Sequence, residues 1–423
     1  MKKSYIFLFI IFMFIASCGN KVTAPSVSDI TYYEPNDAIR KTYSYSINDG
    51  KTDAMITVEG TFKKLAESAN AIIYVEESQI DKGITKRDIL SFLREFENYV
   101  PKEIEIYGEI PDFDGNGKVI FLMANLNTNA TTSITGGYFS SSDLIYGKAG
   151  VPGEYLHINV PTSESTIGLM MHELQHLINY YNNAMQGKAM DIWLNEALAE
   201  STSHMFSATL TDERKNLFIN YPYYSFYSWY LMYTDRSFVF TPNHVLISYA
   251  SSSMFMKWLD NQTGGKQEIY KEIAHSDLSL TTEERLLNIT SKYSLGNDMN
   301  TVLLNWIEGI NNGDIQGLTI GAIDPTDKNF NQNGSIPLLP KSLVVYSTAN
   351  NNISGDKLST RQLGQTGLSV VINTSVNNQK AGFANKEDVV NIAINKAANL
   401  NSSIKYQKSN LTDRIFHIDK VID

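Results

Sequence analysis

Two stretches determine what the rest of this chain must build: HELQHL at residues 172–177 and WLNEALAE at residues 193–200. Residues four apart lie on one face of an α-helix, so His172 and His176 can offer two imidazole nitrogens to a single metal ion. Glu173 points beside that face, where its carboxylate can hold a water molecule on the metal. The order H-E-x-x-H is typical of a catalytic zinc site.

A catalytic zinc also needs a third protein ligand and one open position. Glu196 is a candidate, 20 residues after His176. The pattern of apolar residues over 191–206 predicts a second helix, which Asp191 can cap. The polar segment 182–188 can form a turn that lets the two helices pack antiparallel. Glu200, one turn after Glu196, could accept the remaining N–H of a ligand histidine, a partner that metal-bound histidines usually need.

The alternative interpretation is two surface histidines on one amphipathic helix and two solvated glutamates on another. Glu196 and Glu200 both occur where a zinc site requires carboxylates, and this coincidence favours the metal. We therefore expect one catalytic Zn²⁺.

With this spacing, the chain resembles the gluzincin class of zinc peptidases, which includes thermolysin. The fuller text HELQHLINYYNN…IWLNEALAESTSH is most similar to the hyicolysin-type neutral metallopeptidases, chiefly over residues 112–265. The resemblance implies that His172, His176 and Glu196 are the zinc ligands. It also implies that Glu173 is the general base and that Glu200 supports a ligand histidine.

The segment YASSSMFMKWLDNQTGG, which begins at Tyr249, resembles a gluzincin aminopeptidase segment whose tyrosine donates a hydrogen bond to the tetrahedral intermediate. Tyr249 is the candidate for that role, and His204 and His244 are its rivals. Ser252 stands where those enzymes usually have glycine. The sequence also lacks their G-x-M-x-N anchor for a free amino terminus, which favours an endopeptidase over an aminopeptidase.

The N-terminus has a basic start followed by an apolar run from Tyr5 to Ala16, the pattern of a signal peptide at residues 1–17. Small residues before Cys18 resemble a bacterial lipobox, which implies a lipidated Cys18 and a lipoprotein of the cell envelope. Cys18 is the only cysteine in the chain, so no disulfide can form within it. We expect a flexible tether over residues 18–44.

The composition is that of a globular protein with a substantial core, since 43% of its 423 residues are hydrophobic. A formal net charge of −10 argues against nucleic acid as a partner. The expected partners are polypeptide substrates and a membrane, reached through the lipidated N-terminus. The oligomeric state stays open.

We expect an α+β fold with a catalytic domain over 45–323, divided into a β-rich N-terminal lobe (45–165) and a mostly helical lobe (166–323). Strands are predicted at 54–58, 71–75, 119–123 and 155–160, with a helix over 85–100 that starts at Thr85-x-x-Asp88. The segment 134–139 is either an edge strand that holds an extended peptide or an ordinary loop. His157 is expected to be a packed or surface histidine and not a ligand.

Residues 112–117, DFDGNG, match the first half of a calcium loop, with Asp112, Asp114 and Asn116 as ligands. The glutamate expected at the twelfth position is absent, because Met123 stands there. A tight Asn-Gly turn ahead of a strand is the preferred interpretation, and Ca²⁺ is the alternative.

Helices are expected at 282–291 and 299–310. Residues 324–340 are rich in Asn, Gly and Pro and indicate a linker. Predicted strands at 343–346, 368–372 and 389–394 suggest a small β-rich C-terminal appendage within 324–423.

The chemistry expected from these residues is metal-assisted peptide hydrolysis. Zinc would lower the pKa of a water molecule, Glu173 would move its proton, and Tyr249 would stabilise the oxyanion. The rival hypothesis is a non-catalytic surface lipoprotein, an adhesin or scaffold on an inactive peptidase fold. The presence of Glu173 counts against that rival.

Overall fold

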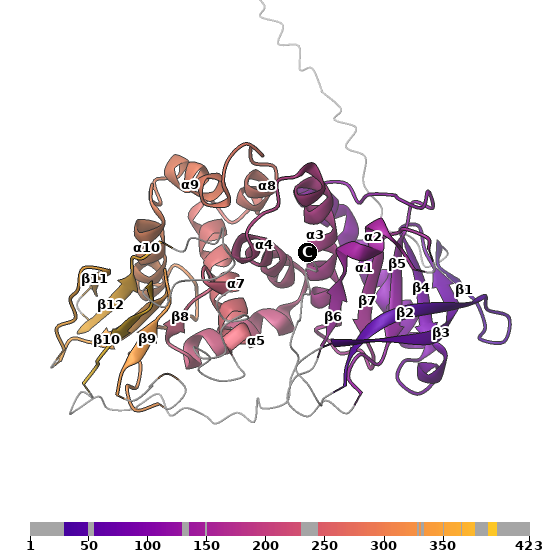
Figure 1. Ribbon diagram of the computed structural model, residues 1–423, viewed down its shortest axis with the longest axis horizontal. Coiled ribbons are helices and arrows are strands. Elements are labelled where there is room, and N and C mark those ends of the chain that lie inside the picture. The colour runs from indigo at the N-terminus through magenta and orange to yellow at the C-terminus, as the bar shows by residue number, and fades with distance from the viewer. Residues whose placement is uncertain are drawn as a thin grey trace, which may run out of the picture.

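The elements of the chain fall into three regions. The computed structural model describes residues 29–49, 55–128, 135–148, 150–229, 244–327, 330, 334–349, 351–364, 366–376 and 388–395. Figure 1 shows a strand-rich N-terminal region, a helical middle and a second group of strands beyond the helices. The expected mixture of helices and strands, with a β-rich N-terminal region and a helical middle, is confirmed.

In the described N-terminal region, seven strands form a mixed sheet in the order β1-β3-β4-β5-β7-β6, with β2 paired to β3 beside that path. Strands β4, β5 and β7 run parallel and the other pairs are antiparallel. Strand β6 therefore lies at one edge of the sheet. The bounds are β1 Thr31–Tyr32, β2 Arg40–Asn48, β3 Met55–Glu67, β4 Ala71–Glu76, β5 Val119–Ala124, β6 Gly137–Phe139 and β7 Tyr155–Asn159.

Helix α1 (Lys86–Tyr107) connects β4 to the parallel strand β5 and packs on the sheet. It starts with the predicted capping box, in which Thr85 and Asp88 exchange side-chain and backbone hydrogen bonds. Its apolar residues recur at helical spacing and are buried. Phe92 and Phe96 each meet the Phe121 ring of β5 edge-on, with ring centroids 5.1 Å apart. The sheet and α1 thus form the layer against which helix α3 (Thr166–Asn182) packs.

The middle of the chain is helical, as expected. Helices α3 and α4 pack together, and α4 and α5 both pack on α7. The bounds are α2 Ser141–Ile145, α3 Thr166–Asn182, α4 Ile192–Phe206, α5 Ala208–Asn220, α7 His244–Gln262, α8 Glu268–Ala274, α9 Thr282–Lys292 and α10 Met299–Asn311. Across the described helices, no stretch combines the length and the apolar character needed to cross a bilayer.

The C-terminal strands are joined to the helical region. In the described residues a four-stranded sheet has the order β11-β12-β10-β8, and β9 pairs with β13. The predicted strands correspond to β10, β12 and β13, whereas β9 and β11 were not predicted. The bounds are β8 Tyr223–Tyr224, β9 Ile336–Leu338, β10 Leu343–Ser347, β11 Leu358–Leu363, β12 Leu368–Asn373 and β13 Val390–Ile392.

The expectation of a linker over 324–340 followed by a separate appendage is wrong. Phe330, Ile336 and Leu338 are buried in one hydrophobic cluster with Tyr223 and Ile247 of the helical region. Strand β8 follows α5 in the chain but pairs with β10 of the C-terminal sheet. The Asn, Gly and Pro of this segment shape turns around buried apolar residues, and composition alone does not distinguish this from a linker.

Two local expectations also need correction. The tether expected over 18–44 is too long, because β1 and the first residues of β2 pair with β3. Asp191 precedes α4 but makes no side-chain cap. The signal peptide and Cys18 lie outside the described residues.

Candidate metal centre

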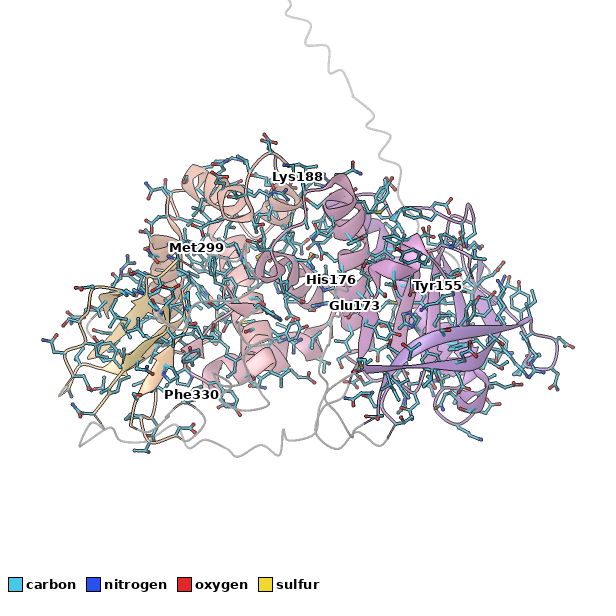
Figure 2. All side chains as sticks on the ribbon, viewed as in Figure 1. Tyr155, Glu173, His176, Lys188, Met299 and Phe330 are labelled. Atoms are coloured by element: carbon cyan, nitrogen blue, oxygen red, sulfur yellow. The ribbon has the colours of Figure 1, made fainter. Side chains whose placement is uncertain are left out.

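Helix α3 carries the H-E-x-x-H residues in the interior of the protein. His172 and Glu173 are 0% exposed and His176 is 4% exposed. Figure 2 places Glu173 and His176 between the N-terminal strands and the helical region. A surface-helix interpretation of these residues is therefore wrong. Burying three such side chains is unfavourable unless they are paired or bind a metal.

Helix α4 packs on α3 and brings the second motif to the first. The two helices are bridged by Asn179 and Asn195, whose side chains are 2.5 Å apart (Nδ2 to Oδ1). The connection between them includes Gly187 with a φ of +73°, a left-handed conformation that suits glycine. Glu196 then faces His172 and His176 and is 2% exposed.

His172, His176 and Glu196 form a group that could hold one metal ion. Glu196 Oε2 lies 3.5 Å from His172 Nε2 and 3.6 Å from His176 Nε2. Ligands bound at about 2.0–2.1 Å around a tetrahedral zinc ion lie about 3.3–3.4 Å from one another. Two imidazoles and one carboxylate are also a donor set of catalytic zinc sites. The residues therefore fit Zn²⁺ in both spacing and chemistry.

Glu200 lies behind the first histidine, as the sequence predicts. Its Oε1 is 3.4 Å from His172 Nδ1, and Ser203 Oγ is 3.5 Å from the same nitrogen. Glu200 also accepts two hydrogen bonds from Arg214 of α5, at 2.8 and 2.9 Å. Burial alone would raise the pKa of Glu200, but Arg214 and His172 hold it well below its usual value. Glu200 is thus a buried carboxylate anion beside His172.

Arg214 is a site residue that the sequence analysis missed. It is 2% exposed and lies one helix beyond the motifs. Its guanidinium carbon is also 5.0 Å from the centroid of the Tyr249 ring. No local pattern marks this arginine. The only signal was a basic residue within the helix that follows the two glutamates.

Glu173 is held by the edge strand of the N-terminal sheet. Its Oε2 accepts a hydrogen bond of 2.9 Å from the backbone N–H of Phe139 in β6. The strand can approach α3 this closely because residue 137 is glycine. A Cβ at Gly137 would lie 2.9 Å from His157 O and 3.6 Å from Glu173 Cγ. Gly137–Phe139 form an edge strand and not an ordinary loop, and Ile134 lies outside the described residues.

Tyr249 lies on α7 beside the histidine pair. Its ring centroid is 5.8 Å from that of His172 and 4.7 Å from that of Trp229. The residue is fully buried. The structure therefore brings Tyr249 to the same centre as the predicted metal ligands, although it comes from another helix 73 residues after His176.

The rival histidines lie elsewhere or are not described. His204 Nε2 is 2.8 Å from the hydroxyl of Tyr270 on α8. Burial, with Lys257 adding to it, lowers the pKa of His204 to about 3. A histidine that is neutral at neutral pH is a poor proton donor. His244 begins α7, but its side chain lies outside the described residues.

His157 is a packed histidine, as predicted. Its Nε2 is 2.9 Å from Asp143 Oδ2, and its ring stacks on Tyr138 with a centroid distance of 4.1 Å. Burial lowers its pKa although Asp143 opposes the change. His157 therefore belongs to the sheet core and not to the metal centre.

The loop at residues 112–117 forms a turn stabilised by its own side chains. Asp112 Oδ1 accepts from Gly117 N at 3.0 Å, and Asp114 Oδ2 accepts from the amide of Asn116 at 2.6 Å. Asn116 Oδ1 accepts from Lys118 N at 2.6 Å. Asn116 is therefore engaged within the loop.

The buried centre thus places two histidines and one carboxylate at zinc spacing, with a second carboxylate beside them. No protein-family model matches the chain. Over 229 residues the chain is 28% identical to the neutral metalloprotease ShpI of Staphylococcus hyicus, an alignment that covers 50% of each protein. The chain thus spans about half the length of this curated relative. The similarity supports a distant relation to metallopeptidases.

Proposed function

We propose that the chain is a zinc-dependent endopeptidase with His172, His176 and Glu196 as the zinc ligands. One observation carries this proposal. The buried donor atoms of these three residues lie at the distances expected around one zinc ion. The buried carboxylate of Glu173 lies next to them and accepts a hydrogen bond from the edge strand β6. The similarity to a neutral metalloprotease supports the same conclusion. The gluzincin resemblance of the two motifs is part of this proposal.

A zinc ion in this position supplies Lewis-acid chemistry, polarising a carbonyl group and acidifying a water molecule. Glu173 takes a proton from the attacking water and later delivers it to the leaving amine. The hydrogen bond from Phe139 N fixes the direction of the Glu173 carboxylate and favours its charged form. Glu173 is thereby held ready as a base next to the three ligands.

The substrate would bind as an extended peptide along β6. This strand is the edge of the sheet, so one side of its backbone is available for pairing. Glu173 is hydrogen-bonded to the same strand, and therefore a peptide on β6 would pass close to the metal centre. A strand-like mode of binding needs no free terminus, which agrees with endopeptidase activity.

Tyr249 is the candidate for stabilising the oxyanion. Its ring lies beside His172, and the guanidinium group of Arg214 lies over the same ring. A phenol that donates a hydrogen bond to the developing negative charge would lower the barrier of the chemical step. Glu200, held by Arg214, would keep His172 oriented toward the zinc.

The decisive experiment compares the chain from Gly19 onward with its Glu173→Ala variant. Zinc content would be measured by elemental analysis, and cleavage with quenched peptides that are acetylated and amidated. We expect one zinc per chain in both proteins. Cleavage of the blocked peptides at internal bonds is expected only in the parent, since a lost general base costs about 10²–10⁴ in rate.

Two results would contradict the proposal. If neither protein binds zinc, the ligand assignment is wrong. If both proteins bind one zinc and neither cleaves any peptide of a broad library, the chain is the non-catalytic surface protein considered as the rival. Release of single residues from unblocked peptides, with the blocked ones intact, would make it an exopeptidase.

We also propose export as a bacterial lipoprotein of the cell envelope, anchored through Cys18. This rests on the apolar run that ends in small residues before the cysteine. Mass spectrometry of the mature N-terminus in the native host would test it. A diacylglyceryl group on Cys18 is expected, and a Cys18→Ala variant should be released from the membrane fraction.

A further inference from the structure

A second group of carboxylates lies in the N-terminal region, away from the metal centre. Among the described residues, Asp112, Asp114 and Glu154 can each offer one oxygen, and these atoms lie within 4.8 Å of one another. Asp112 and Asp114 belong to the turn before β5, whereas Glu154 directly precedes β7. The three residues therefore meet only because β5 and β7 pair.

Glu154 is the informative member of this group. It is 0% exposed. Its Oε1 accepts a hydrogen bond of 2.6 Å from Phe113 N, in the middle of the loop. Its Oε2 is buried and has no hydrogen-bond partner in the described part of the chain. A buried carboxylate oxygen without a donor is unfavourable, and a cation is one of the few groups that would satisfy it.

The charges around Glu154 give the same indication. None of the ion pairs in the described residues involves Asp112, Asp114 or Glu154, and Lys118 extends to Ser68 O and Glu67 instead. Burial, with the charges of Asp114 and Asp112 adding to its effect, raises the pKa of Glu154 to about 7. Three carboxylates near one another without a positive charge are destabilising unless a cation neutralises them.

The loop has the geometry of a cation-binding turn. Gly117 occupies the sixth position of the loop, counted from Asp112 as the first, and has a φ of +68°, as the sharp turn of a calcium loop requires. The acidic residue that such a loop usually has at its twelfth position is missing from this sequence. Glu154 supplies a carboxylate from the neighbouring strand, a contribution that the sequence pattern could not reveal.

We propose that Asp112, Asp114 and Glu154 bind one Ca²⁺ ion. All three donors are carboxylate oxygens, which suits a hard cation and not zinc. Oxygens on opposite sides of a calcium ion are about 4.6–5.2 Å apart, so atoms within 4.8 Å of one another can share it. Backbone carbonyls and water would complete the coordination.

Calcium at this position would stabilise the contact between the loop and helix α3. Phe113 lies between Asp112 and Asp114, and its ring meets Tyr181 of α3 edge-on with centroids 5.9 Å apart. Fixing the loop would therefore fix a contact at the end of the helix that carries His172 and His176. The role is structural, and it does not depend on the proposed peptidase activity.

The test uses the zinc-loaded full chain, titrated with CaCl₂ and, separately, with MgCl₂ in a calorimeter and in thermal unfolding. We expect one equivalent of Ca²⁺ to bind and the melting temperature to rise by about 5 °C at a concentration roughly 100-fold above Kd. Glu154→Gln keeps an acceptor for Phe113 N but removes one charge. It should weaken calcium binding by at least about tenfold and abolish most of the thermal shift.

Two further variants make the test specific. The matched control, Glu109→Gln, removes an exposed acid three residues before Asp112 and should bind calcium like the parent. Glu173→Ala should also bind it unchanged, which separates this proposal from the peptidase proposal. The proposal is wrong if the parent shows neither binding heat nor thermal shift, or if Glu154→Gln binds calcium as tightly as the parent does.

Discussion

Arg214 holds Glu200 by two parallel hydrogen bonds, from Nε at 2.8 Å and from Nη2 at 2.9 Å, inside the protein. The other side of Glu200 faces His172 Nδ1 at 3.4 Å. The arginine therefore fixes a carboxylate that in turn can fix the histidine. Such a chain of contacts orients a metal ligand and increases its basicity.

Glu200→Gln should weaken zinc binding by about 10–100-fold, because the amide cannot supply the negative charge that favours the His172 N–H. Competition with a zinc chelator would measure the affinity. Ser203→Ala is the matched comparison, since Ser203 Oγ also lies 3.5 Å from His172 Nδ1. If only Ser203→Ala weakens binding, then Ser203 and not Glu200 orients the histidine.

Arg214→Met should lower the free energy of unfolding by about 3–5 kcal/mol, because it leaves Glu200 buried as an unpaired charge. Urea unfolding of the zinc-free protein would measure this. The double variant Arg214→Met, Glu200→Gln should recover a substantial part of the loss, since no unpaired charge remains. Strictly additive losses would mean that the two residues do not act as a pair.

The sequence was sufficient to bring the proposed metal ligands together, because helical periodicity places His172 beside His176 whatever the rest of the fold is. Glu196 and Glu200 follow the same rule on the next helix. Arg214 and Glu154 could not be predicted, because each reaches its partners through helix or strand pairing that no local pattern encodes. The short strands β1, β9 and β11 were missed for a similar reason, since pairing partners far along the chain decide whether such segments become strands.

Tyr249→Phe should lower kcat by about 10²–10³ with little change in KM, if the hydroxyl stabilises the oxyanion as proposed. Zinc content and melting temperature should stay close to those of the parent, because the ring still packs on Trp229 and His172. Steady-state kinetics on a quenched peptide would test this. An unchanged kcat would restrict Tyr249 to packing and leave the oxyanion to another residue.

Ending the chain after Ile323 should prevent stable folding of the helical region. The truncation removes β10, which pairs with β8, and uncovers Tyr223 and Ile247. Thermal unfolding and gel filtration would show the loss of a cooperative transition. A stable, monodisperse 1–323 chain would restore the appendage interpretation.

A milder variant is Tyr223→Phe, which removes the hydrogen bonds to Pro337 O and from Leu339 N. It should lower the free energy of unfolding by about 1–3 kcal/mol.

His204 should make the folded state less stable as the pH falls below about 6.5. Its pKa is lowered to about 3 in the folded protein, by burial first and by Lys257 of α7 second, while Glu200 of α4 opposes the change. The unfolded chain takes up a proton near pH 6.5 and the folded chain does not. The contribution of this residue to the free energy of unfolding is therefore present above pH 6.5 and is lost by up to about 1.4 kcal/mol per pH unit below it.

His204→Gln keeps a polar partner for Tyr270 of α8 but cannot titrate. Urea unfolding between pH 7 and pH 4.5 should give a shallower loss of stability for the variant than for the parent. Parallel curves would mean that His204 has the same pKa in the folded and unfolded states.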